Sequence, residues 1–263
     1  TDVRDLVGRV DCASVATPTP SHAEVGLMLL DAGIDVLVEK PIAATLEEAR
    51  ALVRRAAELG RILQVGHLER FNPAFRALRD IVTHPRFLEC HRLAPFVERG
   101  SDVDVVLDLM IHDLDVILSI VRSPVASVEA VGVPVVTSTV DIANARIRFE
   151  NRAIANVTAS RVSLKRERKL RIFQEDTYIS VDYDEKAMRI CRRLPAEEGA
   201  LPAIDVEERS VESGDALREE IRHFVACVRS REEPLVSGRE GLQAMEVAHQ
   251  VLASLRTELE RQG

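Results

Sequence analysis

Strand-like and helix-like segments alternate at the beginning of this chain. Short apolar stretches lie at 12–16, 34–38 and 62–65, and amphipathic helical patterns separate them. Because strands that are joined through helices build βαβ units, this order predicts neighbouring parallel strands. Apolar, β-branched strands are typical of a sheet that helices cover on both faces. The first part of the chain is therefore expected to adopt an α/β fold.

Signals for helix ends support this assignment. A capping-box pair precedes each helix and a glycine follows it: Ser21 with Glu24 and then Gly33, and Thr45 with Glu48 and then Gly60. In such a pair the hydroxyl accepts a bond from a backbone N–H, and the glutamate accepts one from the cap residue. Glycine ends a helix well because it readily adopts left-handed backbone angles.

The remainder of the chain follows a different plan. Apolar and polar residues alternate with a period of two between 127 and 193, which predicts an antiparallel sheet with one buried face. Helical patterns flank this region, at 73–82, 101–121, 215–230 and 239–260. We therefore expect two domains, 1–71 and an α+β domain at 72–263, with the last helix able to pack back on the first domain.

Composition excludes several classes of protein. The chain is 46% hydrophobic, which suffices for two modest cores, but no apolar stretch reaches the ~20 residues that span a membrane. The formal net charge is −8 and both signs are interspersed, so no surface for nucleic acid is indicated. The four cysteines form no C-x-x-C pair, and the plain interpretation is a reduced, cytoplasmic protein.

Polar residues gather where the predicted parallel strands end: Thr17-Pro18, Glu39-Lys40-Pro41 and Gly66-His67. Ligands of parallel α/β sheets bind beyond the carboxyl ends of the strands. At such a place Lys40 could donate a hydrogen bond to a substrate hydroxyl and stabilise the developing oxyanion. The tripeptide also occurs simply as a strand terminator before a loop.

Other residues near these strand ends have two equally good interpretations. Thr17, Pro18 and His22 either touch a cofactor or serve as turn and first-turn residues. His67 and Arg70 either contact substrate or form salt bridges at the surface.

The apolar helix expected at 101–121 carries one narrow polar stripe. At 100° per residue its members share a sector of about 80°. They are Ser101, Asp104, Asp108, His112, Asp115 and Ser119. Because a helix that is apolar on most of its circumference is buried, charged groups on it must be paired or face a wet cleft. An ordinary solvated stripe and a core histidine held by a carboxylate of the same helix are the two alternatives without a function.

His112 is the candidate general acid or base, because an unperturbed histidine titrates near ~6.5. Asp108, one helical turn earlier, could orient or tune the imidazole. A metal site made by His112 with Asp108 or Asp115 is geometrically open. Without a second histidine or a cysteine cluster nearby, we expect no metal.

Taken in order, these residues resemble the Gfo/Idh/MocA oxidoreductases. The matching motifs are Ala16-Thr17-Pro18 with His22, Glu39-Lys40-Pro41, Val65-Gly66-His67 with Arg70-Phe71-Asn72-Pro73, Asp108-x-x-x-His112, Gly214-Asp215-Ala216-Leu217 with Phe224, and Gly238-Arg239-Glu240-Gly241-Leu242. They cover essentially the whole chain. The resemblance implies a Rossmann-type parallel sheet followed by an α+β domain with a large, mainly antiparallel sheet.

The resemblance also implies an activity, which is hydride transfer between NAD or NADP and a carbinol of a sugar or polyol. Lys40 matches the lysine that contacts substrate near the nicotinamide. Asp108 and His112 match the family's catalytic pair, with the histidine as the usual acid/base.

The remaining positions divide between cofactor and substrate. The residues that match cofactor-binding positions are Thr17, Pro18, His22 and Glu39, together with Lys40. Arg70 and Asp115 are expected on the substrate side.

The segment Asp108–Asp115 looks most like family members that oxidise the 3-hydroxyl of UDP-N-acetylhexosamines. Two alternatives stay open: a polyol dehydrogenase of the inositol type and a non-catalytic NAD-binding member. The expected partner is a sugar or nucleotide-sugar substrate, with no nucleic acid and no membrane. A homodimer or homotetramer through the antiparallel sheet is also expected.

The chain departs from the family pattern in two places. Val105-Val106-Leu107 stands where many members have glycines. A G-x-G-x-x-G fingerprint and the charged residue that selects NAD or NADP are also absent. We therefore expect about 60 further residues, equivalent to two βα units, to precede this segment and complete the Rossmann sheet.

Overall fold

The computed structural model describes residues 2–97, 103–196, 201–210 and 214–262. Two compact units make up the chain: residues 1–72 with 215–246, and residues 73–214 with 247–263. The division expected from the sequence, 1–71 and 72–263, put residues 215–246 in the second domain, whereas the structure puts them in unit 1. They belong with the first unit because the chain returns to β3 there, where Val65 N–H donates to the Val236 carbonyl at 2.9 Å.

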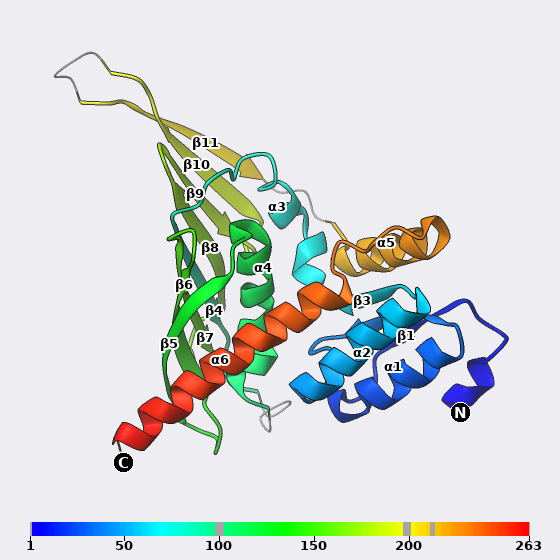
Figure 1. The fold of residues 1–263 in the computed structure, drawn as a ribbon. Helices are drawn as coiled ribbons and strands as arrows, with labels where there is room; N and C mark the ends of the chain where they lie inside the picture. The colour runs from blue at the N-terminus through cyan, green and yellow to red at the C-terminus, as the bar shows by residue number, and fades with distance from the viewer. Residues whose placement is uncertain (1, 98–102, 197–200, 211–213, 263) are drawn as a thin grey trace. The chain divides into compact units, whose positions relative to one another are not determined.

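Unit 1 is built on a three-stranded parallel sheet in the order β1-β2-β3 (Figure 1). The strands are β1 Cys12–Val15, β2 Asp35–Glu39 and β3 Leu63–Gly66. The helices are α1 His22–Asp31, α2 Leu46–Leu59, α5 Ala216–Ser230 and the first part of α6 Gly238–Gln262. Short 3-10 turns occupy Val3–Leu6, Thr19–Ser21 and Leu68–Phe71. The predicted parallel neighbours are confirmed.

Helix ends in unit 1 agree with the sequence in all but one respect. Thr45 and Glu48 form both bonds of the capping box, and Gly60 ends α2 in the left-handed conformation. The capping box predicted for Ser21 and Glu24 is wrong. Ser21 already has helical backbone angles inside a 3-10 turn, and its hydroxyl donates to the Pro18 carbonyl at 2.8 Å instead.

Unit 2 contains an eight-stranded sheet in the order β11-β10-β9-β8-β4-β7-β6-β5. The strands are β4 Phe87–Leu93, β5 Val125–Val133, β6 Ile142–Phe149, β7 Ile154–Ser160, β8 Glu167–Gln174, β9 Thr177–Asp182, β10 Ala187–Arg193 and β11 Ile204–Ser210. Every pair is antiparallel except β4 with β7. The large, mainly antiparallel sheet is confirmed, with β4 added in its middle and β11 at one edge.

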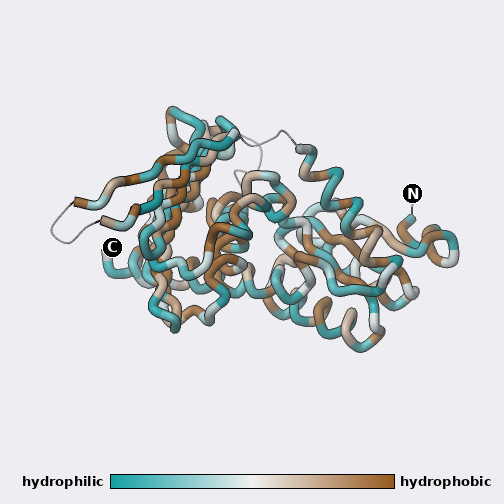
Figure 2. The backbone as a smooth tube through the Cα atoms, turned by 90° about the horizontal axis from the view of Figure 1, so that it is seen from above, coloured by the Kyte–Doolittle hydropathy of each residue, from teal (hydrophilic) through white to brown (hydrophobic). Residues whose placement is uncertain are grey.

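The buried face of this sheet is the one that the period of two predicted. Along β6, Ala143, Ala145, Ile147 and Phe149 are at most 3% exposed. Apolar and polar segments alternate along the strands of this unit in Figure 2. The apolar face makes the core together with the helix that precedes β5.

The helices of unit 2 are shorter than the sequence suggested. The one expected at 73–82 is a single turn, α3 Pro73–Arg76, followed by further turns. The one expected at 101–121 consists of a π-helical turn, Val106–Met110, that leads into α4 Ile111–Val121. No helix in the described part of the chain is long and apolar enough to cross a membrane.

Candidate active site

The carboxyl end of β2 carries the first candidate residues. Glu39 is the last residue of β2 and lies opposite Gly66, the last residue of β3. Lys40 and Pro41 follow directly; Lys40 is half-buried, and the peptide bond between the two is cis. Glu39 and Lys40 therefore lie at the edge of the sheet where α/β folds bind their ligands.

The loop after β1 lies at the same edge. Thr17 and Pro18 are exposed there. His22, the first residue of α1, is only 1% exposed, and its ring nitrogens contact the carbonyls of Thr17 and Pro41 at 2.8 and 2.9 Å. Thr17 and Pro18 are thus open to a ligand, whereas both ring nitrogens of His22 already face backbone oxygens.

His67 and Arg70 lie in the interior of unit 1. Their exposed fractions are 1% and 7%, so the surface salt bridges considered from the sequence are excluded. Arg70 belongs to the 3-10 turn after β3, and its guanidinium donates to the Leu235 carbonyl at 3.3 Å. Its role as a substrate contact stays a prediction.

Glu220, on α5, is a buried carboxyl that the sequence analysis missed. It is 1% exposed, and burial together with the negative charge of Glu39 raises its pKa to about 8. Its backbone carbonyl accepts a bond from the side chain of Gln64, on β3, at 3.4 Å. Helical spacing was a signal that could have found it, because Glu220 lies four residues before Phe224 and seven before Cys227, the other buried residues of α5, whereas its neighbour Glu219 is half-buried.

In unit 2, Asp108 lies within the π-helical turn and His112 in the first turn of α4. Both side chains are half-buried. A π-turn takes more residues per turn than an α-helix, so the even 100° spacing assumed for the stripe is wrong across Val106–Met110. Short π segments inside helices occur frequently at functional sites.

The polar stripe is not a solvated face. Asp115 is 2% exposed, and the four other described members are half-buried: Asp104, Asp108, His112 and Ser119. Ser101 lies outside the described residues. Asp104 precedes the helix and accepts a bond from the Val106 N–H at 2.9 Å, and burial raises the pKa of its carboxyl. An ordinary solvated stripe, one of the two interpretations without a function, is therefore excluded.

A buried ion pair anchors the helix that carries His112. Arg92, on β4, donates two hydrogen bonds of 2.8 Å to the carboxylate of Asp113, and both residues are at most 7% exposed. Asp113 interrupts an otherwise apolar run, and Arg92 occupies the buried side of its strand. Because a buried charge is costly without a partner, each of these two side chains requires the other.

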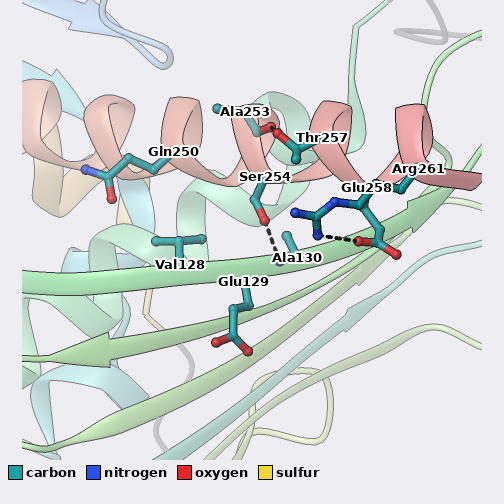
Figure 3. A pocket seen from close by; sticks show the side chains of 9 residues that line it. All are labelled: Val128, Glu129, Ala130, Gln250, Ala253, Ser254, Thr257, Glu258 and Arg261. Carbon is teal, nitrogen blue, oxygen red and sulfur yellow. Dashed lines mark hydrogen bonds and ion pairs between the residues drawn. The ribbon is translucent and has the colours of Figure 1, made fainter.

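A metal cluster and a surface pocket are two other kinds of place where a ligand could bind. Within the described residues, no group of three or more His, Cys, Asp or Glu side chains is arranged to hold a metal ion. A pocket of about 660 Å³ lies between β5 and the end of α6 (Figure 3). It is lined by Val128, Glu129, Ala130, Gln250, Ala253, Ser254, Thr257, Glu258 and Arg261. None of the sequence-predicted site residues lines it.

Comparison with known proteins identifies the parts of the chain. The family described as "Oxidoreductase family, NAD-binding Rossmann fold" matches residues 1–67, and the GFO/IDH/MocA C-terminal domain matches residues 47–180. UDP-N-acetylglucosamine 3-dehydrogenase of Acidithiobacillus ferrooxidans is 37% identical over 257 residues, which cover 97% of this chain and 82% of that protein. Inositol 2-dehydrogenase of Mycolicibacterium smegmatis is 35% identical over 126 residues, covering 45% of this chain and 36% of the relative.

Solved structures agree with the sequence matches. The structure of the Acidithiobacillus ferrooxidans UDP-N-acetylglucosamine 3-dehydrogenase superimposes with a TM-score of 0.91 at 36% identity, covering 97% of this chain and 82% of that one. An oxidoreductase domain protein from Kribbella flavida has a TM-score of 0.88 at 22% identity, over 98% and 82% of the two chains, and supports the fold alone. The motifs, the two sheets and these matches lead to one conclusion: the chain is a dehydrogenase that belongs to the Gfo/Idh/MocA family of oxidoreductases.

Proposed function

We propose that this enzyme oxidises or reduces a sugar or nucleotide-sugar hydroxyl with NAD or NADP, and that the 3-hydroxyl of a UDP-N-acetylhexosamine is the first candidate. The main support for this substrate is the length of the match to one relative. Identity of 37% to a UDP-N-acetylglucosamine 3-dehydrogenase extends over 97% of the chain and therefore includes most of both units. We propose the second unit as the part that binds substrate.

A polyol of the inositol type is the second candidate substrate. Four inositol 2-dehydrogenases match at 31–35% identity, each over less than half of the chain. A scyllo-inositol 2-dehydrogenase of Bacillus subtilis matches over 94% of the chain, but at 27% identity. These matches support the polyol less strongly than the 37% identity over 97% of the chain supports the nucleotide sugar.

The strand ends of unit 1 fit a nicotinamide cofactor. Thr17 and Pro18 are exposed at the carboxyl end of β1, and Glu39 and Lys40 are partly accessible at the end of β2. We propose these four residues as contacts on the nicotinamide side. When bound, the cofactor supplies a hydride acceptor or donor at that edge of the sheet.

The proton chemistry is assigned to three side chains. A base must take the hydroxyl proton as the carbon gives up hydride, and His112 has the chemistry for this step. Asp108 orients its imidazole. Lys40 donates a hydrogen bond to the substrate oxygen and stabilises the negative charge that develops there. Arg70 and Asp115 are proposed as substrate-side residues, acting from buried positions.

The proposal also covers assembly and location. The polar face of the large sheet carries paired side chains, such as Arg171 with Glu89 at 2.8 Å and Arg146 with Asn156 at 3.2 Å. We propose that a second copy of the chain covers this face, in a homodimer or homotetramer. We also propose that the enzyme acts in the cytoplasm, where its cysteines stay reduced. Light scattering in solution tests the assembly, and a monomer at all concentrations would contradict it.

The activity test follows nicotinamide absorbance with UDP-N-acetylglucosamine and then with myo-inositol, each with NAD and NADP. His112→Ala should lower kcat by about 10²–10⁴-fold, and Lys40→Met by about 10²–10³-fold. Cofactor affinity should change little, because the lost interactions belong mainly to the transition state. His84, exposed on a turn, provides the control His84→Ala, which should behave as wild type.

Two results would contradict the assignment. If neither substrate class is turned over with either cofactor, the proposed reaction is wrong. If His112→Ala keeps near-normal turnover and an unchanged pH–rate profile, His112 is not the base and the remaining alternative, a core histidine, is correct.

A further inference from the structure

The ring of His22 joins two loops of unit 1. Its Nε2 lies 2.8 Å from the carbonyl oxygen of Thr17, in the loop after β1, and its Nδ1 lies 2.9 Å from that of Pro41, in the loop after β2. The side chain is 1% exposed. The two loops therefore meet on one buried imidazole.

The chemistry of these contacts leaves little room for another partner. A carbonyl oxygen only accepts hydrogen bonds, so each ring nitrogen must carry a hydrogen to bond its loop. The imidazolium form donates to both loops, and a neutral ring donates to one. In either form neither nitrogen is directed at solvent.

The loop after β2 is the part of the sheet edge that matters most for the proposed reaction. Pro41, whose carbonyl contacts His22, directly follows Lys40, and the next two residues, Ile42 and Ala43, are at most 1% exposed. Lys40 thus lies between the end of a strand and a segment that is anchored by packing and by His22.

We propose that His22 is a positioning residue that acts through the backbone carbonyls of Thr17 and Pro41 and holds Lys40 in place. It does not contact the cofactor, which differs from the role suggested by the family resemblance. This inference rests on the proposed role of Lys40 in the reaction. A misplacement of about 1 Å at a reacting group can lower the rate by about 10²-fold.

Two conservative variants separate the two hydrogen bonds. The amide nitrogen of asparagine is as many bonds from Cα as Nδ1 of histidine, and that of glutamine as many as Nε2. His22→Asn therefore keeps a donor for Pro41, and His22→Gln keeps one for Thr17. We expect kcat to fall about 10–100-fold in His22→Ala, to recover largely in His22→Asn, and to recover less in His22→Gln.

Binding and coupling measurements distinguish this role from the others. Calorimetry with NAD⁺ and NADP⁺ should show that the affinity falls much less than kcat in all three variants, because Thr17 and Lys40 are still present to contact the cofactor. A raised Kd with normal kcat would overturn the proposal in favour of a cofactor contact. When Lys40 is already replaced by Met, His22→Ala should lower activity little further, because the Lys40 ammonium that His22 positions is absent.

The same design separates the failure of this inference from that of the proposed function. If Lys40→Met retains full activity, the role of Lys40 is wrong whatever His22 does. If Lys40→Met is impaired but His22→Asn and His22→Gln both match wild type, the positioning role is refuted. It is also refuted if His22→Ala lowers activity equally in the wild type and in the Lys40→Met variant. Should His22→Ala fail to fold, the comparison of Asn with Gln still decides the matter.

Discussion

Replacing Glu220 by glutamine removes a carboxyl whose environment disfavours its charge. Glu220 is 1% exposed, and burial together with the charge of Glu39 raises its pKa from an ordinary 4.5 to about 8. Glutamine has nearly the same volume as the protonated acid and cannot ionise. The variant should therefore leave the fold intact and abolish one titration.

The sign of the effect follows from proton linkage. Between pH 4.5 and about 8 the folded chain keeps a proton on Glu220 that the unfolded chain releases. Folding stability must then fall as pH rises through this window, by about 1.4 kcal/mol per pH unit. Below the window both states are protonated, and above it both are ionised and the loss is complete. From about pH 5.5 to 7.5 the wild type should thus lose somewhat less than ~3 kcal/mol relative to Glu220→Gln.

Thermal unfolding across this pH range measures the difference. For chains of this size 1 kcal/mol corresponds to about 2–4 °C, so the gap in Tm between variant and wild type should widen by about 5–10 °C. Glu233→Gln, at an exposed position of the same unit, should show no such trend. A gap that stays constant with pH would show that Glu220 is already ionised in the folded protein, and the reasoning from burial would be wrong.

Two further predictions concern unit 2. Arg92→Met leaves Asp113 buried without its bidentate partner and should cost about 3–5 kcal/mol in urea unfolding, whereas adding Asp113→Leu should restore most of the loss. Asp141 is fully buried and accepts backbone bonds from Val135, Val136 and Thr137, which outweigh burial and lower its pKa. Asp141→Asn should therefore cost about 2–3 kcal/mol near neutral pH. This cost should shrink as the pH falls below about 4, because the unfolded wild-type chain then takes up a proton on Asp141 while the folded carboxylate, with its lowered pKa, stays ionised. Unfolding at the two pH values checks both statements.

Local patterns predicted most of the elements and much of the core. The period of two along β6 identified the residues that are buried, because successive side chains of a strand point to opposite faces. The Thr45–Glu48 capping box formed as expected, since its bonds lie within one helical turn. The strand ends that carry Thr17 and Lys40 followed from the same βαβ pattern. Their roles in the reaction stay predictions until the variants are measured.

Other features depend on contacts between segments far apart in the chain. The insertion of β4 between β7 and β8 has no local signal, because strand pairing depends on which edges are available after the chain collapses. The π-helical turn around Asp108 likewise breaks the regular period that the sequence suggests.

The sequence by itself determined the family, the parallel and antiparallel sheets, and the position of Lys40 directly after a strand. Only the tertiary structure decided that His22 bonds two loops, that Arg92 meets Asp113 and that Glu220 lies near the negative charge of Glu39. The reason is physical. Periodicity reports which side of an element is apolar, whereas the pairing and desolvation of a polar group depend on neighbours that the fold brings from elsewhere in the chain.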